Sequence, residues 1–417
     1  MKSVGLLVIV VAVLFLCGTA DAVVWYVHPD SSLNAIQAGL DSCAENDTVL
    51  VGAGTYVENI VWPSTDGIVL MSEYGRDTTV IDGGGLDAVI QINVGDSLIV
   101  IDGFTIQNGY GNTGYKSGGI YLNACGALTI KNNIITNNTG IWTGGITCFH
   151  SWPLIMDNMI TYNTCDTAGG GIFMISGSNP TISDNEIAYN EARWAGGIYS
   201  VSSIEGTITG NHIHHNTATI YGGGIGIAWS SGGTYRHNII EYNSTNTGLG
   251  GGLYFYSNAT PTFDSCDITN NTEGIYNSLL NSAPVIHYCN ITDNIGYAAR
   301  STSSTIDCEN NWWGDASGPY HPTLNPGGLG DTIGANVDFD PWLAGPVGVE
   351  EQPIVGPIRE QQNLTATILR GPLQLPEDKQ CKVFDITGRV VEPDRIAPGI
   401  YFLEVDNNIV QKIIKVR

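Results

Sequence analysis

The chain has 417 residues, of which 13% are charged and 53 are glycine, and its formal net charge is −24. This composition excludes a helical protein held by surface salt bridges, and it excludes an ordinary disordered chain. The negative charge opposes phosphate backbones and anionic lipid surfaces, so nucleic-acid binding is excluded as well.

The N-terminus predicts export. Lys2 precedes an apolar run at residues 4–16, and the small residues Cys17, Ala20 and Ala22 follow it. This order is typical of a cleaved signal peptide, here residues 1–22, with lipidation of Cys17 as the alternative. The run is shorter than the ~20 residues of a membrane-spanning helix. We therefore expect no membrane span in the mature chain.

The first element expected in the mature chain is a short helix. Residues 33–44 carry apolar side chains at helical spacing. A stack of repeats exposes apolar surface at its ends, so we expect this helix to cap the N-terminal end of such a stack.

A repeat dominates the chain that follows. A pair of glycines before an apolar residue recurs, and the second glycines of successive pairs are 26, 26, 26, 27 and 28 residues apart. They are Gly119, Gly145, Gly171, Gly197, Gly224 and Gly252. Between them lie phrases of the form apolar-x-x-Asn-x-Ile-x-x-Asn. Alternating apolar residues in such short segments predict strands, and this period fits one coil of a parallel β-helix, with coils ~4.8 Å apart.

Asparagine recurs at two positions of each coil. Its side chain tolerates left-handed backbone angles and bonds to neighbouring backbone, so it suits sharp corners. We expect two ladders of stacked amides, one at residues 133, 158, 185, 211 and 238 and the other at 138, 163, 190, 216 and 243. The glycine pairs predict a corner with positive φ or close backbone approach.

Eight cysteines follow the signal peptide, at positions 43, 125, 148, 165, 266, 289, 308 and 381. Cys266 and Cys289 occupy the first ladder position in later coils, and Cys308 falls near it in the next coil. Buried free thiols are the favoured interpretation, since free cysteine is among the most buried residues. Disulfides, which export permits, stay open for Cys125, Cys148 and Cys165. No spacing typical of a metal site occurs.

These motifs resemble the right-handed parallel β-helix family, which includes pectin lyases, polygalacturonases and bacterial surface proteins. Residues 54–59 and 101–106 are similar to phrases of the opening coils, and residues 310–343 resemble a closing cap. The resemblance implies an all-β fold with a right-handed parallel β-helix (solenoid) over residues 23–345.

The tail is a separate unit. Residues 346–362 are rich in Pro, Gly and Val and predict a linker. Residues 363–417 have strand alternation that predicts a small C-terminal β-sandwich, and the phrases at 383–389 and 398–403 resemble the type A sorting domain of the bacterial type IX secretion system. That resemblance implies export through outer-membrane secretion machinery, followed by attachment to the cell surface or release.

Catalytic motifs are weak. Inverting glycoside hydrolysis needs two carboxylates at a set separation, and the Asp-Asp pair of the polygalacturonases does not occur. A lyase needs a base and a group that holds the uronate. Arg193 and Arg236 are the candidate bases, and the candidate calcium ligands beside them are Asp157, Asp184 and Glu186. Each has an alternative interpretation as a solvated side chain.

Histidines gather in two adjacent coils, at positions 212, 214, 215 and 237. We expect His212 and His214 to share one strand face, because strand side chains alternate. No carboxylate or cysteine in the pattern completes a recognisable metal site, so no metal is predicted there.

Aromatic residues form three rows when the coils are aligned. The first is expected to point away from the interior and comprises Tyr121, Phe173, Tyr199, Tyr254 and Tyr276. The second precedes the glycine pairs and comprises Trp142, Trp194 and Tyr221; the third comprises Tyr162, Tyr189, His215 and Tyr242. Rings in rows suit sugar faces, but they also stack on one another. For the second row, sugar binding and ring stacking are equally favoured interpretations. For the other two rows, ring stacking is favoured.

The sequence thus predicts a secreted, cell-surface, monomeric β-helix protein that binds extracellular polysaccharide or glycan. The predicted binding residues are Trp142, Trp194, Tyr221, Tyr121, Phe173, Tyr199 and Tyr254. Ca²⁺ could offset the negative charge, and no other cofactor is expected. The alternatives are a polysaccharide lyase that acts on a uronate-containing polymer and a non-catalytic structural adhesin.

Overall fold

The computed structural model describes residues 22–93, 98–278 and 281–348, and five strands between residues 366 and 415. Of the predicted signal peptide only Ala22 lies within the described residues, and the predicted linker lies outside them beyond residue 348. Within the described part of the chain, no helix has the length and hydropathy of a membrane span.

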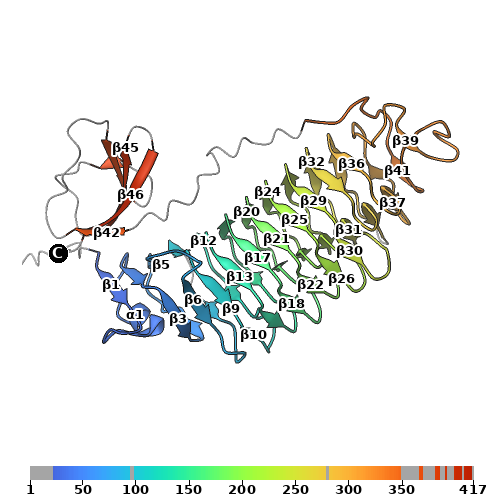
Figure 1. The fold of residues 1–417 in the computed structure, drawn as a ribbon. Helices are drawn as coiled ribbons and strands as arrows, with labels where there is room; N and C mark the ends of the chain where they lie inside the picture. Colours follow the sequence, from blue (N-terminus) through green and yellow to red (C-terminus); the bar gives the residue numbers. More distant parts are fainter. Residues whose placement is uncertain are drawn as a thin grey trace, which may run out of the picture.

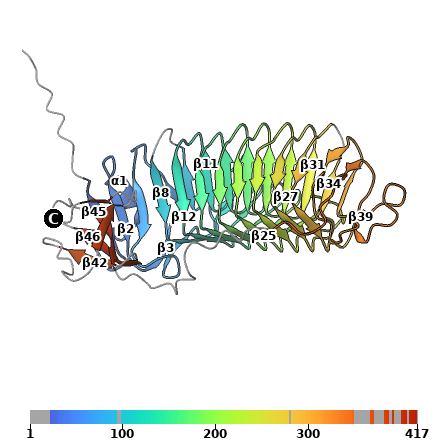
Figure 2. The ribbon, with the colours of Figure 1, turned by 90° about the horizontal axis from the view of Figure 1, so that it is seen from above.

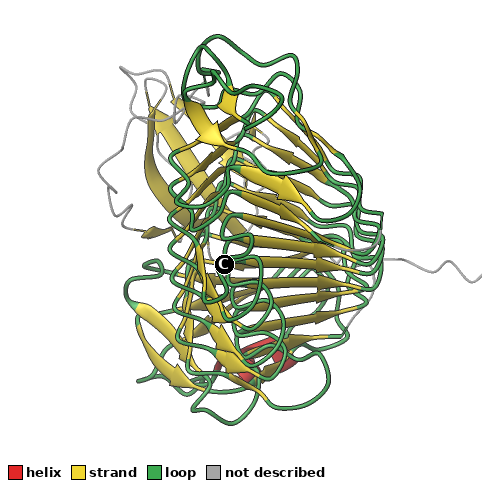
Figure 3. Ribbon diagram, turned by 90° about the vertical axis from the view of Figure 1, so that its right-hand side faces the viewer, coloured by secondary structure: helices red, strands yellow, loops and turns green. Residues whose placement is uncertain are grey.

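Short strands of successive coils pair in parallel and build a solenoid (Figure 1). The 13-stranded sheet, sheet A, consists of β1 (Val24–Val27), β2 (Thr48–Val51), β5 (Val69–Ser72), β8 (Ile99–Asp102), β12 (Leu128–Lys131), β16 (Leu154–Met156), β20 (Thr181–Ser183), β24 (Thr207–Thr209), β28 (Thr234–Arg236), β32 (Thr262–Asp264), β35 (Val285–His287), β38 (Ile306–Asp307) and β41 (Val337–Asp338). Figure 3 shows how the strands stack, with loops at the corners.

Two ten-stranded sheets follow sheet A around each coil. Sheet B consists of β3 (Gly54–Val57), β6 (Thr79–Asp82), β9 (Thr105–Gln107), β13 (Ile134–Thr136), β17 (Met159–Thr161), β21 (Glu186–Ala188), β25 (His212–His214), β29 (Ile239–Glu241), β33 (Asp267–Thr269) and β36 (Asn290–Thr292). Sheet C, seen side-on in Figure 2, consists of β4 (Ile60–Val61), β7 (Ile90–Ile92), β11 (Ile120–Asn123), β15 (Ile146–Phe149), β19 (Ile172–Ile175), β23 (Ile198–Val201), β27 (Ile225–Ala228), β31 (Leu253–Tyr256), β34 (Ile275–Asn277) and β37 (Ala299–Ser301).

Sheet D lies between sheets B and C in chain order and has two residues per strand. It consists of β10 (Tyr110–Gly111), β14 (Thr139–Gly140), β18 (Thr164–Cys165), β22 (Glu191–Ala192), β26 (Thr217–Ala218) and β30 (Ser244–Thr245).

Because side chains alternate between the two faces of a strand, each sheet points one column of apolar side chains into the interior of the solenoid. In sheet A the inward column is in register from coil to coil and is fully buried; it comprises Val49, Leu70, Ile101, Ile130, Ile155, Ile182, Ile208, Tyr235, Phe263 and Ile286. Burial of a side chain of this size contributes ~1.5–3 kcal/mol. The interior is therefore one continuous core.

Both predicted asparagine ladders are confirmed. Asn133, for example, donates its backbone N–H to the side-chain oxygen of Asn158 at 3.0 Å, and its amide donates to the Ile101 carbonyl of the preceding coil at 3.1 Å. The second ladder continues beyond its predicted end to Asn271 and Asn294. Each amide thus satisfies buried backbone groups at a corner.

The glycine pairs allow the backbones of adjacent coils to approach closely, and they are not used for a positive φ. A Cβ at Gly197 would lie 2.5 Å from the carbonyl oxygen of Gly224 in the next coil. Neither glycine of this pair has a left-handed φ.

The cysteines in the solenoid are free thiols, including Cys125, Cys148 and Cys165. Cys266 and Cys289 take ladder positions as predicted, with the Cys266 N–H donating to the Cys289 Sγ at 3.4 Å. The expectation for Cys308 is wrong, because the Asn311 side chain accepts from the Cys289 N–H at 2.8 Å and takes the next rung.

A third ladder escaped the sequence analysis. At the turn from sheet C to sheet A, the backbone N–H of Cys125 donates to the Ser151 hydroxyl and that of Ser151 donates to the Ser178 hydroxyl, both at 3.1 Å. A signal was present, because a proline follows two residues after each of these serines, at Pro153 and Pro180.

The two ends of the solenoid are covered. At the N-terminal end, α1 (Ile36–Asp41) lies within the predicted helix and buries Ile36. The Glu58 carboxylate accepts its first backbone N–H groups, at 2.8 and 2.9 Å. At the other end lie β39 (Pro319–Tyr320) and β40 (Gly330–Thr332), and Trp313 is fully buried.

The described strands of the tail form one five-stranded sheet. Its order is β42 (Ala366–Leu369), β46 (Asn408–Lys415), β45 (Gly399–Val405), β43 (Cys381–Asp385) and β44 (Val390–Val391). A second sheet, which a sandwich requires, is not among the strands described there. The sandwich and the sorting domain stay predictions.

Candidate ligand-binding groove

The first aromatic row lies on the outer face of sheet C, as alternation predicts. Its members are in register, but the expected exposure is wrong for most of them: Phe173 and Tyr254 are only 1% and 2% exposed. They are covered because rings of the second row lie on them. Trp142 stacks on Phe173 at 6.3 Å between ring centroids, and Tyr221 stacks on Tyr254 at 4.4 Å.

The second row is thus the outer layer of an aromatic cluster. Trp142, Trp194 and Tyr221 are partly buried, and so is Tyr121 of the first row. Tyr199 is 7% exposed. Of the predicted binding residues, Phe173, Tyr199 and Tyr254 therefore offer little surface to a ligand, whereas the other four retain some.

The third row is the most exposed. Tyr162, Tyr189 and Tyr242 are 54%, 43% and 48% exposed, and they lie with His215 in the turns from sheet B to sheet D. Each has a left-handed φ of 53° to 57°. Successive ring centroids are 5.0, 5.0 and 5.2 Å apart with near-parallel planes. The rings stack as predicted, so their edges and hydroxyls, not their inner faces, meet solvent; we call this row the ring ladder.

Two hollows run along sheet D beside the ring ladder. One, of about 520 Å³, is lined by Asp82, Gly84, Gly85, Asn108, Gly109, Tyr110, Asn137 and Thr139. The other, of about 420 Å³, is lined by Thr139, Thr164, Cys165, Asp166, Glu191, Ala192, Arg193 and Thr219. Both include Thr139, so they adjoin, and we call them together the sheet D groove. Trp142 and Trp194 follow strands β14 and β22 by two residues, on the side away from the ring ladder.

The groove presents carboxylate, amide and hydroxyl groups. Hydrogen bonds from Gln107, Gly84 and Asn108 outweigh desolvation and lower the pKa of Asp82, so its carboxylate is charged at neutral pH. Burial raises the pKa of the Cys165 thiol to about 12, which keeps it protonated and inert.

Arg193 is the cation of this groove, and its surroundings differ from those of the other cations in residues 22–348. Four of these pair with carboxylates, namely Lys116 with Asp87, Lys131 with Asp102, Arg236 with Asp264 and Arg300 with Glu273. Arg76 donates to a backbone carbonyl. Within the described residues Arg193 makes no ion pair, and its guanidinium lies 6.0 Å from the Trp194 ring centroid. It is thus the cation in that region that is free to bind a ligand.

The other lyase candidates are dispersed. Arg236 lies on the outer face of sheet A, 3.5 Å from Asp264, and so does not share the groove with Arg193. Asp157 and Asp184 lie in adjacent turns between sheets A and B, where burial and then Asp184 raise the pKa of Asp157. Glu186 is on sheet B and faces a histidine. In the described residues, no three His, Cys, Asp or Glu side chains gather in a metal-holding group.

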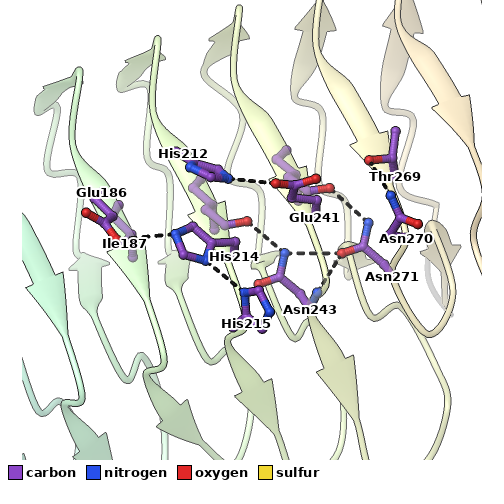
Figure 4. Close-up of polar contacts among 12 residues, drawn as sticks. Glu186, Ile187, His212, His214, His215, Glu241, Asn243, Thr269, Asn270 and Asn271 are labelled. Atoms are coloured by element: carbon purple, nitrogen blue, oxygen red, sulfur yellow. Dashed lines mark hydrogen bonds and ion pairs between the residues drawn. The ribbon is translucent and has the colours of Figure 1, made fainter. Parts of the chain in front are cut away.

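Three of the four histidines do come together, with His212 and His214 on strand β25 of sheet B and His215 in the turn that follows it (Figure 4). His212 contacts Glu241 at 2.9 Å and His214 contacts Glu186 at 3.4 Å, so two of the histidines pair with carboxylates. The partners come from neighbouring coils, which sequence spacing alone did not pair. His237 lies apart, in a turn between sheets A and B.

Comparison with solved structures finds chains that are similar to this one. A solved catalytic unit of a GH87 alpha-1,3-glucanase from Streptomyces thermodiastaticus is 12% identical, with a TM-score of 0.35; the match covers 74% of this chain and 65% of that one. Pectin methylesterase PemA from Erwinia chrysanthemi is also 12% identical, with a TM-score of 0.36, over 77% of this chain and 93% of that one. Comparison with curated protein sequences gives no match.

The family model described as "right handed beta helix region" matches residues 87–248 and 219–317, which together make up more than half of the chain. These are the coils that carry the glycine pairs, both asparagine ladders and most of the groove. The chain belongs to the right-handed β-helix family.

Proposed function

We propose that this protein binds an extracellular polysaccharide in the sheet D groove. The observation that carries the proposal is the pair of adjoining hollows, which cross six consecutive coils. With coils ~4.8 Å apart, the groove is about 24 Å long. A long, open, polar groove bordered by aromatic side chains suits an extended polymer of sugar units better than a compact ligand.

The groups of the groove have distinct roles in this proposal. Hydroxyls and amides, such as those of Thr139, Thr164 and Asn108, bond to sugar hydroxyls. Trp142 and Trp194 border the ligand on one side, and the ring ladder does so on the other. Arg193 supplies a charge-assisted hydrogen bond. Ca²⁺ would act only as a counter-ion to the carboxylates of Asp166 and Glu191.

The proposal includes export to the cell surface. It rests on the signal-like N-terminus and on the resemblance of residues 363–417 to a type IX sorting domain. Secretion would place the groove where extracellular glycans are, and a single chain would suffice for binding.

Arg193→Gln is expected to weaken binding about tenfold to a hundredfold, because a hydrogen bond to a charged group contributes ~1.5–3 kcal/mol. The measurement is affinity electrophoresis of the full chain through gels cast with soluble β-glucan, xylan or polygalacturonate, with and without Ca²⁺. Arg236→Gln is the matched control, because it removes the same group from sheet A. Equal retardation of the two variants would contradict the proposal. A cleared track would indicate a lyase, and free migration in every gel would leave a structural adhesin.

A further inference from the structure

His214 and His215 form an unusual contact where strand β25 of sheet B ends and the chain turns towards strand β26 of sheet D. Side chains of consecutive strand residues normally point to opposite faces. Strand β25 ends at His214, however, and His215 has a left-handed φ of 53°. This turn brings the two rings together, with Nδ1 of His214 2.9 Å from Nδ1 of His215 (Figure 4).

The contact restricts where protons can be. A hydrogen bond between two Nδ1 atoms needs one N–H donor and one bare nitrogen. Glu186, 3.4 Å from Nε2 of His214, favours a proton on that nitrogen. His214 then accepts at Nδ1, and His215 donates.

Added protons have different effects on this pair. One added proton leaves the contact intact, because one of the two Nδ1 atoms can still stay bare and accept. When both rings are cationic, two N–H groups face each other at 2.9 Å, and the contact is lost.

The groups around His214 influence the pH at which it is protonated. Desolvation lowers the pKa of His214 most, the charges of His212 and His215 lower it further, and Glu186 opposes them. The charged or titratable groups on the elements packed against the pair are Glu186 and Tyr189 from β21 and its turn, His212 from β25, and Glu241 and Tyr242 from β29 and its turn. Glu241 is paired with His212 at 2.9 Å, which leaves Glu186 as the carboxylate facing the pair.

We infer that His214 and His215 are an acid-sensitive switch at the turn that leads from strand β25 into strand β26 of sheet D. With one shared proton the pair holds His215 in the ring ladder, between Tyr189 and Tyr242. Protonation of His214 beside a cationic His215 separates the two imidazoles, and the exposed His215 leaves the ladder. This inference rests on the proposed function in so far as the groove binds a polysaccharide, and it adds that binding is lost in acid.

The direction in which stability changes with pH follows from the lowered pKa of His214. Above the ordinary histidine value of ~6.5 the folded and unfolded chains both hold His214 neutral, so stability does not vary with its titration. As the pH falls below that value, the unfolded chain binds the proton first. Stability is therefore lost progressively down to the lowered pKa of His214, and the ladder itself is disrupted only as the pH falls through that pKa.

The primary test is a titration of the full chain without any polysaccharide. The ¹³Cε1–¹H signals of labelled histidine are followed by NMR, and His214 is assigned with His214→Asn. We expect a His214 midpoint below that of a free imidazole, and a higher midpoint in His215→Phe, which keeps a ring in the stack. The ring signals of Tyr189 and Tyr242 should shift with the His214 titration, whereas those of Tyr110 should not. An unchanged His214 midpoint in His215→Phe, or tyrosine signals that ignore it, would overturn the switch.

A second test reads out binding. In gels cast with β-glucan, xylan or polygalacturonate, retardation of the wild type should weaken roughly tenfold between pH 7.5 and pH 5.0, within the usual range of coupling between sites. His215→Phe should bind equally at both pH values. The same pH dependence in both proteins would overturn the switch. Absence of wild-type binding at either pH would instead refute the proposed function, and the NMR titration would still decide the histidine pair.

Discussion

Replacing Gly197 with alanine is expected to destabilise the solenoid by at least ~3 kcal/mol, at the upper end of overpacking costs. The added Cβ would lie 2.5 Å from the Gly224 carbonyl oxygen, 3.1 Å from Ile213 Cγ2 and 3.2 Å from the Asn216 amide nitrogen. The nearest atom is backbone, and it already accepts the Ile198 N–H at 2.9 Å. Relief of the clash therefore requires the two coils to move apart, which breaks hydrogen bonds between strands.

Urea unfolding of the full chain, followed by far-ultraviolet circular dichroism, measures this effect. Gly327→Ala is the control, because a Cβ at Gly327 meets nothing within 4 Å and its φ is not left-handed. An unfolding midpoint of Gly197→Ala that equals the control would show that the coils can separate at this corner without cost, and it would refute the close-approach role of the glycine pairs.

Replacing Asn138 with alanine is expected to cost ~2–5 kcal/mol. The side-chain oxygen of Asn138 accepts the Gly109 N–H at 2.9 Å, and its amide donates to the Ile106 carbonyl at 3.0 Å. Asn138 is fully buried, so water does not replace either bond. Each buried group left without a partner costs ~1–3 kcal/mol.

Asn137→Gly is the matched control for this ladder substitution. Asn137 is the preceding residue, is exposed and has a φ of 53°, which glycine adopts without strain. The same unfolding experiment should separate the two variants clearly. Equal midpoints would mean that the asparagine ladder contributes nothing beyond its corner geometry.

Much of the solenoid was predictable because it depends on local periodicity. The inward column through Ile130, the two ladders and the thiol rungs at Cys266 and Cys289 all follow from alternation within a strand and from a near-constant coil length. Cys308 was misplaced because it follows Cys289 by only 19 residues, whereas the coil there is 22 residues long, so Asn311 takes the rung.

The candidate groove was only partly predictable. Trp142, Trp194 and Arg193 were singled out from the sequence, and the structure places all three at or beside sheet D. Tyr162 and its neighbours in the ring ladder were recognised as a row but were not among the predicted binding residues, although this row is the most exposed of the three. The spacing of a row shows that rings align, but it does not show what lies on top of them.

The sequence by itself determined the architecture, because a parallel coil repeats the same hydrogen bonds each time its period recurs, and only residues such as Asn185 at the corners satisfy them. Only the tertiary structure decided which surface is open. Trp142 covers Phe173, and His214 pairs with Glu186; both are contacts between coils. Arg193, by contrast, makes no ion pair among the described residues. Such contacts depend on side-chain direction and lateral register, which a periodic pattern in one chain does not encode.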